Sequence, residues 1–234
     1  MADVSRETLA APDPVVAALV FAPDRIPALE RYAGMLADQG VLRGLIGPRE
    51  VPRLWDRHLI NCGLLATWVP DGATVADLGS GAGLPGLVLA LARADLRVTL
   101  IEPMARRVAF LEEACAELGL DHVEVVRGRA EEGRSGGRYD VVTARALAPL
   151  PRLLEWGMPL VGQGGSLLAM KGSSAATEVE AAREELGRGR ARAEVLTASV
   201  PGSSVTTAVR VVRDPGAGIG WPVSSARRRR REHA

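Results

Sequence analysis

The sequence predicts an α/β protein, with a mostly parallel seven-stranded sheet and an N-terminal helical extension. Two observations support this fold class. After position 70, short apolar segments alternate with helical segments over about 100 residues, which is typical of a parallel sheet covered by helices on both faces. The last two strand-like segments are separated by Pro201-Gly-Ser-Ser204. This short polar connection predicts an antiparallel hairpin that completes the sheet.

The composition is that of a globular protein. The chain has 234 residues, of which 47% are hydrophobic and only 3% aromatic, so we expect a large aliphatic core. Two cysteines, Cys62 and Cys115, are too few for a disulfide framework or a four-cysteine zinc site. We therefore expect a cytoplasmic protein without a metal. Apolar runs such as 15–22 are shorter than the ~20 residues of a membrane helix, and no export signal is visible.

The chain divides into three regions. Residues 1–69 are expected to form the helical extension, with a short apolar stretch at 14–21 and helical spacing at 26–39 and 52–68. The turn at Pro70-Asp-Gly72 then opens the main domain, 70–215. The last region, 216–234, is expected to be a flexible tail, because five of its last eight residues are arginine.

Within the main domain the pattern predicts strands and helices in alternation. The expected strands are 74–78, 97–101, 123–127, 139–143, 165–170, 193–200 and 205–213. The expected helices are 84–94, 104–119, 149–160 and 173–187. Helical spacing places Met104, Val108 and Leu111 in the core.

A glycine-rich turn follows the first strand. Gly81-Ala-Gly83-Leu-Pro-Gly86 matches the dinucleotide-binding spacing, in which glycines allow a tight turn and a close backbone approach to the ligand. The spacing alone does not distinguish a nicotinamide dinucleotide from S-adenosylmethionine.

Acidic residues near this turn favour the second ligand. Asp77 directly precedes the turn. A loop that binds a pyrophosphate has no need of a carboxylate there, whereas a carboxylate could bind a ligand ammonium group, directly or through water. Glu102 ends the next strand, where an acid binds the ribose hydroxyls of either cofactor. Ala130 and Glu131 follow the third strand and are expected to border the adenine.

Five motifs occur in a fixed order between about residues 52 and 213: D-L-G-S-G-A-G-L-P-G, R-R-V-A-F-L, R-A-E-E, Y-D-V-V-T-A-R-A and A-M-K-G. In this combination the chain resembles the RsmG (GidB) family, bacterial 16S rRNA methyltransferases that modify guanine N7 in the 530 loop. The resemblance implies a class I S-adenosylmethionine-dependent fold, with the small ribosomal subunit as partner. It also implies cofactor contacts from Gly79, Leu84, Ala130, Glu131 and Arg145, in addition to Asp77, Gly81, Gly83 and Glu102.

The chain departs from its relatives at two places. It has Glu102-Pro103 where relatives usually have Asp then Ser, and the longer carboxylate reaches the same hydroxyls. It also reads Arg57-His58-Leu-Ile-Asn61-Cys62 where relatives tend to read R-H-x-x-D-S, so one carboxylate is lost.

The implied chemistry is an in-line methyl transfer without a general base, because guanine N7 already carries an available lone pair. The fourth strand ends in Thr143-Ala-Arg145-Ala and lacks the Asn/Asp-Pro-Pro-aromatic segment of exocyclic-amine methyltransferases. We therefore assign no catalytic residue. Arg145 and Lys171, the only lysine of the chain, are positioning candidates.

RNA contacts are expected from basic residues that cluster in space, since the chain carries a net charge of only +1. The candidates are Arg57, His58, Arg127, Arg129 and Lys171. Each has an alternative role, namely a core histidine for His58 and solvated surface cations for the others. The arginine-rich tail would add salt-dependent phosphate attraction. We expect a monomer with no obligate protein partner.

Three other functions remain compatible with parts of the sequence. A small-molecule methyltransferase would share the fold but ignore ribosomal RNA. An NAD(P)-dependent oxidoreductase is allowed by the literal glycine spacing, and a non-catalytic RNA-binding protein would keep only the cofactor fold. Fold alone does not choose among them, whereas the order of motifs favours the rRNA methyltransferase.

Overall fold

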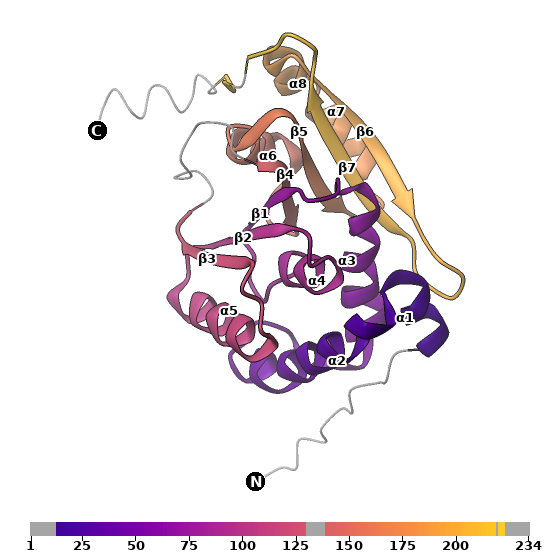
Figure 1. Cartoon of the computed structure of the whole chain (residues 1–234). Helices are drawn as coiled ribbons and strands as arrows, with labels where there is room; N and C mark the ends of the chain where they lie inside the picture. Colours follow the sequence, from indigo (N-terminus) through magenta and orange to yellow (C-terminus); the bar gives the residue numbers. More distant parts are fainter. Residues whose placement is uncertain (1–12, 130–138, 219, 223–234) are drawn as a thin grey trace.

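The computed structural model describes residues 13–129, 139–218 and 220–222. Seven strands form one sheet in the order β3-β2-β1-β4-β5-β7-β6 (Figure 1). The strands are β1 (Thr74–Leu78), β2 (Arg97–Glu102), β3 (Val123–Arg127), β4 (Tyr139–Arg145), β5 (Val161–Lys171), β6 (Ala191–Ala198) and β7 (Thr206–Arg213). Strands β1 to β5 are parallel, and β7 runs antiparallel to both β5 and β6. The predicted mixed sheet with a C-terminal hairpin is confirmed.

Short helices precede and separate these strands. The helices are α1 (Pro14–Val20), α2 (Ile26–Met35), α3 (Asn61–Leu64), α4 (Gly86–Ala92), α5 (Ala105–Leu118), α6 (Leu150–Gly157), α7 (Ala175–Ala181) and α8 (Arg183–Gly189). A π-helical segment, Leu54–Ile60, leads directly into α3. The expected extension at 52–68 is therefore helical throughout, in π, α and 3-10 form.

Three details differ from the predicted elements. The helix expected at 173–187 is two helices that meet at Ala182, whose φ of −95° and ψ of 5° break the regular helix while its side chain is fully buried. Strand β5 begins at Val161 rather than 165. Met104 is 40% exposed instead of buried, because its backbone is still extended where α5 begins.

Two apolar clusters lie on the two faces of the sheet. One contains α4, α5 and residues of the N-terminal extension, among them Leu29, Tyr32 and Leu59. The other contains α6, α7 and α8 residues such as Leu153 and Leu186. Figure 1 shows the extension packed beneath α4 and β7. The extension therefore shares a core with the sheet, and its side chains reach the carboxyl ends of the central strands.

The segment expected as a tail contributes one packed residue. The ring of Trp221 lies against Gly189 at the end of α8, where a Cβ would collide with the ring. Trp221 also packs against the α6–α8 cluster. Residues 223–234, with the arginine run, lie outside the described residues.

Candidate active site

The glycine turn, defined here as Gly79–Gly86, leaves β1 and enters α4. Gly79, Gly81 and Gly83 have φ values of +65°, +60° and +95°, which side chains rarely adopt. A Cβ on Gly83 would collide with Leu87 and lie 2.9 Å from Tyr32 Oη. The Gly79 amide donates to the Ile101 carbonyl at 2.8 Å, which ties the turn to β2. The glycines are thus required by backbone geometry and by close packing.

The two predicted acidic residues are buried beneath this turn. Glu102 is 1% exposed, and its two carboxylate oxygens accept from the amides of Gly81 and Met104, each at 3.0 Å. Asp77 is fully buried, and its Oδ2 accepts from the Gly86 amide at 3.1 Å. Asp77 Oδ1 has no hydrogen-bond partner within the described part of the chain. Burial, with the nearby Glu102 charge, raises the pKa of Asp77 to about 7.

One residue of the site was missed by sequence reasoning. The hydroxyl of Tyr32, on α2, donates to the Ala82 carbonyl inside the glycine turn at 2.6 Å. Tyr32 is fully buried, and burial raises its pKa well above the ordinary value. In the sequence it is one more large residue on an amphipathic helix. Nothing local to it indicates that its hydroxyl lies 50 residues away against a loop.

A cavity of about 530 Å³ opens beside the glycine turn, at the carboxyl ends of β4 and β5. Arg145 and Lys171 end these adjacent strands and both line it. A Cβ on Gly79 would lie 2.6 Å from Leu147 Cδ1, and Leu147 also lines the cavity. Leu147 therefore forms a wall that the turn and the cavity share. The cavity is lined by Arg57, Asn61, Arg145, Ala146, Leu147, Ala148, Pro149, Met170, Lys171, Gly172, Glu178, Val205, Thr206 and Thr207.

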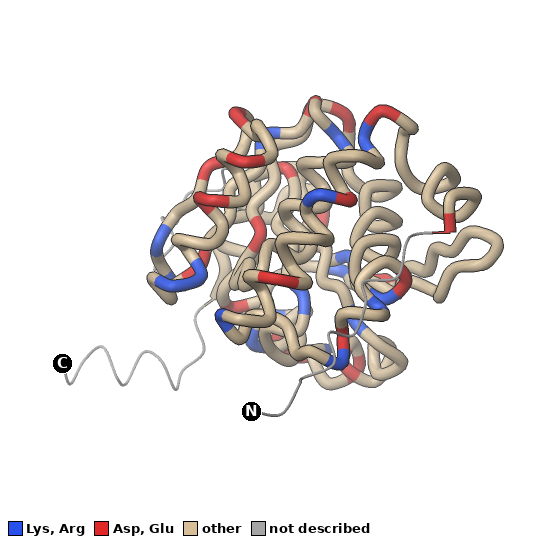
Figure 2. The backbone as a smooth tube through the Cα atoms, turned by 90° about the horizontal axis from the view of Figure 1, so that it is seen from below, with Lys and Arg blue, Asp and Glu red and all other residues tan. Residues whose placement is uncertain are grey.

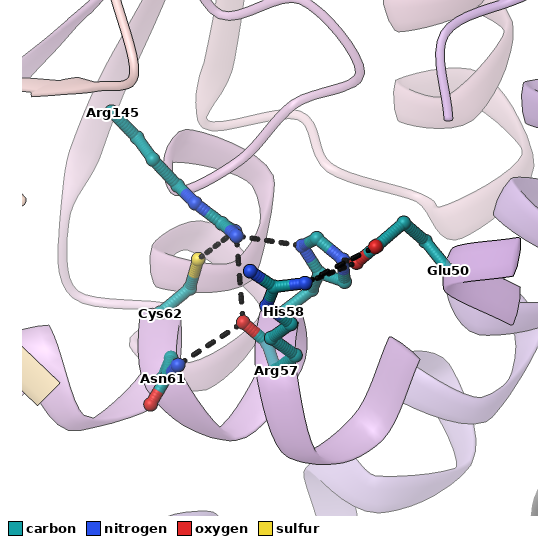
Figure 3. A network of polar contacts seen from close by, with 6 residues as sticks. All are labelled: Glu50, Arg57, His58, Asn61, Cys62 and Arg145. Carbon is teal, nitrogen blue, oxygen red and sulfur yellow. Dashed lines mark hydrogen bonds and ion pairs between the residues drawn. The ribbon is translucent and has the colours of Figure 1, made fainter. Parts of the chain in front are cut away.

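Arg145 is held by groups of the N-terminal extension (Figure 3). Its Nη2 lies 2.7 Å from His58 Nδ1, and Nη1 lies 3.4 Å from Cys62 Sγ. His58 Nε2 lies 2.9 Å from Glu50 Oε2. The next residue, Ala146, has a φ of +50°, a strained value for a residue with a Cβ. Such strain occurs where surrounding contacts impose it, and here it turns the chain into the cavity wall.

Lys171 is also held within the protein. Its Nζ donates to the Ala148 carbonyl at 2.8 Å and pairs with Glu178 at 2.6 Å, and its side chain is 9% exposed. Glu178 also accepts from the Leu150 amide at 2.9 Å. Burial raises the pKa of Glu178, but its bonds to Lys171 and Leu150 outweigh this and lower it. Lys171 thereby fixes the 146–149 loop.

The remaining RNA-contact candidates do not form one cluster. Arg57 is exposed and lines the cavity, where it pairs with Glu50 at 3.2 Å. Arg127 and Arg129 are exposed at the end of β3, on the other side of β1 and β2 from the cavity. Both ring nitrogens of His58 contact side chains of the protein, namely those of Glu50 and Arg145. Ala130 and Glu131 lie outside the described residues. In Figure 2 acidic and basic residues are interspersed along the chain.

The described part of the chain contains neither a membrane-spanning helix nor a cluster of metal-binding side chains. Among residues 13–129, 139–218 and 220–222, no helix is long and apolar enough to cross a membrane. The same residues contain no group of three His, Cys, Asp or Glu side chains that could hold a metal ion.

Comparison with known proteins places this site in a family. The model of the GidB family, described as rRNA small subunit methyltransferase G, matches residues 25–205. The chain is 62% identical over 230 residues to "Ribosomal RNA small subunit methyltransferase G" of Nocardioides sp., covering 97% of this chain and 91% of the relative. It is 57% identical over 191 residues to the Thermobifida fusca protein of the same name, covering 81% and 80%.

The fold agrees with this assignment. The crystal structure of a ribosomal protein L11 methylase from Lactobacillus delbrueckii subsp. bulgaricus superposes with a TM-score of 0.52 at 17% identity, covering 68% of this chain and 79% of that one. At this identity the likeness concerns the class I methyltransferase fold alone. Because the family model matches residues 25–205, which include the glycine turn, and the Nocardioides and Thermobifida fusca relatives are 62% and 57% identical, the chain belongs to the GidB family of methyltransferases.

Proposed function

We propose that this protein transfers a methyl group from S-adenosylmethionine to N7 of a guanine in the 530 loop of 16S rRNA, acting in the cytoplasm as a monomer on the small ribosomal subunit. The observation that carries the proposal is the shared wall between the glycine turn and the cavity lined by Arg145 and Lys171. A donor on the turn and an acceptor in the cavity would lie next to each other. Family membership supports ribosomal RNA as the substrate.

The residues present fit S-adenosylmethionine. The fully buried Asp77 has one oxygen without a partner among the described residues, and this oxygen suits a ligand ammonium group, directly or through water. The three left-handed glycines allow the tight turn that brings backbone close to a ligand, and within the described structure a Cβ on Gly81 would have no neighbour closer than the Gly79 carbonyl oxygen at 3.7 Å. When bound, the cofactor supplies a methyl group activated on a sulfonium. We propose that it is held by Asp77, Gly79, Gly81, Gly83, Leu84, Glu102 and Arg145, together with Ala130 and Glu131.

The chain's own contribution is positioning. Holding donor and acceptor in line supplies about 7–11 kcal/mol of the barrier reduction, and guanine N7 needs no proton removed before it attacks. Glu178, the only carboxylate of the described cavity lining, is already paired with Lys171 and the Leu150 amide. The cavity therefore suits orientation of a base by Arg145, whose guanidinium can donate to guanine O6 and leave the N7 lone pair free for the methyl group.

Binding of the RNA backbone is the second part of the proposal. Arg57 lies at the cavity, while Arg127 and Arg129 extend the basic positions to the end of β3. His58 and Lys171 act through the protein groups they hold. Because these charges are mixed with acidic residues, we propose that the shape of the assembled subunit selects the site, with phosphate contacts adding salt-dependent affinity.

The proposal is tested by incubating the protein with labelled S-adenosylmethionine and small subunits that lack the modification. Borohydride and aniline cleavage then maps N7-methylguanosine. We expect a single cut in the 530 loop. Binding of S-adenosylhomocysteine without transfer to RNA would instead support a small-molecule methyltransferase. Binding of NAD(P)H alone would support an oxidoreductase, and RNA binding without either cofactor would support a non-catalytic role.

A further inference from the structure

The contacts of Arg145 fix the protonation state of His58. A guanidinium has only hydrogen-bond donors, so the His58 Nδ1 atom at 2.7 Å must present a lone pair to it. The single ring proton of neutral His58 is then on Nε2, which donates to Glu50 Oε2 at 2.9 Å. Glu50 thus selects the tautomer that can accept from Arg145, as carboxylates do for metal-binding histidines.

The charges around His58 agree with a neutral ring. Burial lowers the pKa of His58, and Arg145 on β4 and Arg57 on the same π-helical segment lower it further. Glu50, on the 3-10 helix Pro48–Arg53, raises it. Cys62 on α3 lies beneath Arg145, and burial raises its pKa to about 11, so it remains a neutral thiol. Protonation of His58 would place two cationic groups in contact and remove the acceptor that Arg145 uses.

The Arg145 head group has no carboxylate partner in the described part of the chain. Its other contacts are weaker, with Cys62 Sγ and the Arg57 carbonyl each at 3.4 Å. Lys171, in contrast, has Glu178. The position of the Arg145 fork at the cavity therefore depends on His58, the short contact of the network in Figure 3.

We propose that Glu50 and His58 form a positioning pair that holds Arg145 at the cavity for the acceptor base, through an Nε2-protonated neutral imidazole. This inference rests on the proposed function of Arg145. His58 and Glu50 are positioning residues, since they act through Arg145 and do not themselves touch the base. A consequence is that methyl transfer decreases on the acid side, as His58 is protonated below its ordinary pKa.

A matched pair of variants separates this role from simple packing. In His58→Asn the amide oxygen stands where Nδ1 stood and accepts from Arg145. In His58→Gln the amide stands near Nε2 and meets Glu50 instead. We expect His58→Asn to keep kcat/KM for small subunits within about threefold, and His58→Gln to lose about 10- to 100-fold, mostly in kcat. The free energy of unfolding is measured in parallel to report an intact fold, and S-adenosylhomocysteine affinity shows separately whether cofactor contacts of Arg145 change.

The pH profile provides a readout that packing would not change. With S-adenosylmethionine saturating, so that titration of Asp77 does not limit cofactor binding, the wild-type kcat should fall with one ionisation below pH 6.5, and His58→Asn should lack this limb. His122→Gln is the control, because His122 contacts the Ala90 carbonyl at the other end of α4 and should leave the limb unchanged. Equal activity of the Asn and Gln variants, or an acid limb that persists in His58→Asn, overturns the proposal.

The tautomer is tested without any substrate. In ¹⁵N NMR spectra of the full-length protein at pH 7.5, with His58 assigned by its absence in His58→Asn, we expect the shifts of an Nε2-protonated neutral ring. A cationic or Nδ1-protonated ring overturns the inference. If the ring has the expected tautomer but wild-type protein methylates no small subunits, the proposed function fails and the local geometry stands.

Discussion

The glycine turn and the cavity share a wall, yet different groups hold them in place. The turn is fixed mainly by backbone amides that bond to two buried carboxylates, Asp77 and Glu102. The cavity is fixed by charged side chains, because Arg145 is held by His58, 87 residues away, and Lys171 by Glu178 on α7. In the closely packed turn, even a small added side chain is expected to disturb the backbone. At the cavity, a single side-chain contact can be removed while the others remain. Substitutions should therefore affect the two regions differently.

The largest effect is expected from Gly83→Ala in the turn. Its φ of +95° is strained for alanine, at a cost of about 1–3 kcal/mol, and the new Cβ would collide with Leu87 at a similar further cost. We expect S-adenosylhomocysteine affinity to fall about 100-fold or more, measured by titration calorimetry. Gly119→Ala is the control, since Gly119 has a φ of +66° but no atom within 4 Å of its Cβ. Similar affinity losses in both variants would contradict a role for close packing.

The next effect concerns the pH dependence of the free energy of unfolding. It tests the contribution of the buried carboxyl group of Asp77 independently of the glycines. Asp77 has a pKa of about 7 in the folded protein against an ordinary 3.8. Below pH 3.8 it is neutral in both states. Between these values the unfolded chain releases a proton that the folded one retains, so stability falls as pH rises. Above pH 7 the full difference of ~4 kcal/mol is lost.

Asp77→Asn should remove this loss and raise the free energy of unfolding at pH 8, while weakening cofactor binding if Oδ1 meets the ligand ammonium. Denaturant unfolding at pH 5 and pH 8 checks the first part. Asp140→Asn should do the opposite, because bonds from Thr74 lower the pKa of Asp140. An Asp77→Asn variant no more stable than wild type at pH 8 would show that the carboxyl is not buried as described.

A smaller effect is expected at the cavity from Lys171→Met. Loss of the partly buried pair with Glu178 should lower the free energy of unfolding by ~2 kcal/mol and reduce methyl transfer, because the 146–149 loop loses its anchor. The salt dependence of small-subunit binding should remain unchanged. If Lys171 instead contacts a phosphate, the slope of log affinity against log salt decreases by about 1.

The smallest effect is expected from Tyr32→Phe, which removes the bond that the extension makes to the turn. The Ala82 carbonyl would lose its buried donor at a cost of ~1 kcal/mol, and we expect cofactor affinity to fall about fivefold. Tyr139→Phe, at the start of β4 and far from the turn, is the control. Unchanged affinity in Tyr32→Phe, with only a lower melting temperature, would limit Tyr32 to folding.

The alternation of strands and helices in the α/β domain and the glycine turn could be predicted from the sequence. Both depend on local signals: alternation of apolar segments, glycines that adopt left-handed φ, and an acid at the end of β2. The break at Ala182 escaped prediction because it depends on what packs against the helix rather than on the helix's own periodicity. The exposure of Met104 escaped prediction because α5 begins one residue later than expected.

The contacts of the N-terminal extension with the glycine turn and the cavity became visible only in the tertiary structure. Tyr32 and His58 occupy amphipathic segments whose spacing indicates burial and nothing more. In the folded protein their polar atoms contact Ala82 and Arg145, which follow 50 and 87 residues later. Lys171, expected on RNA, donates to the carbonyl of Ala148, which lies 23 residues earlier. Hydrogen bonds between residues far apart in the chain do not affect the periodicity of apolar residues. They depend on how whole helices and strands pack around a shared core.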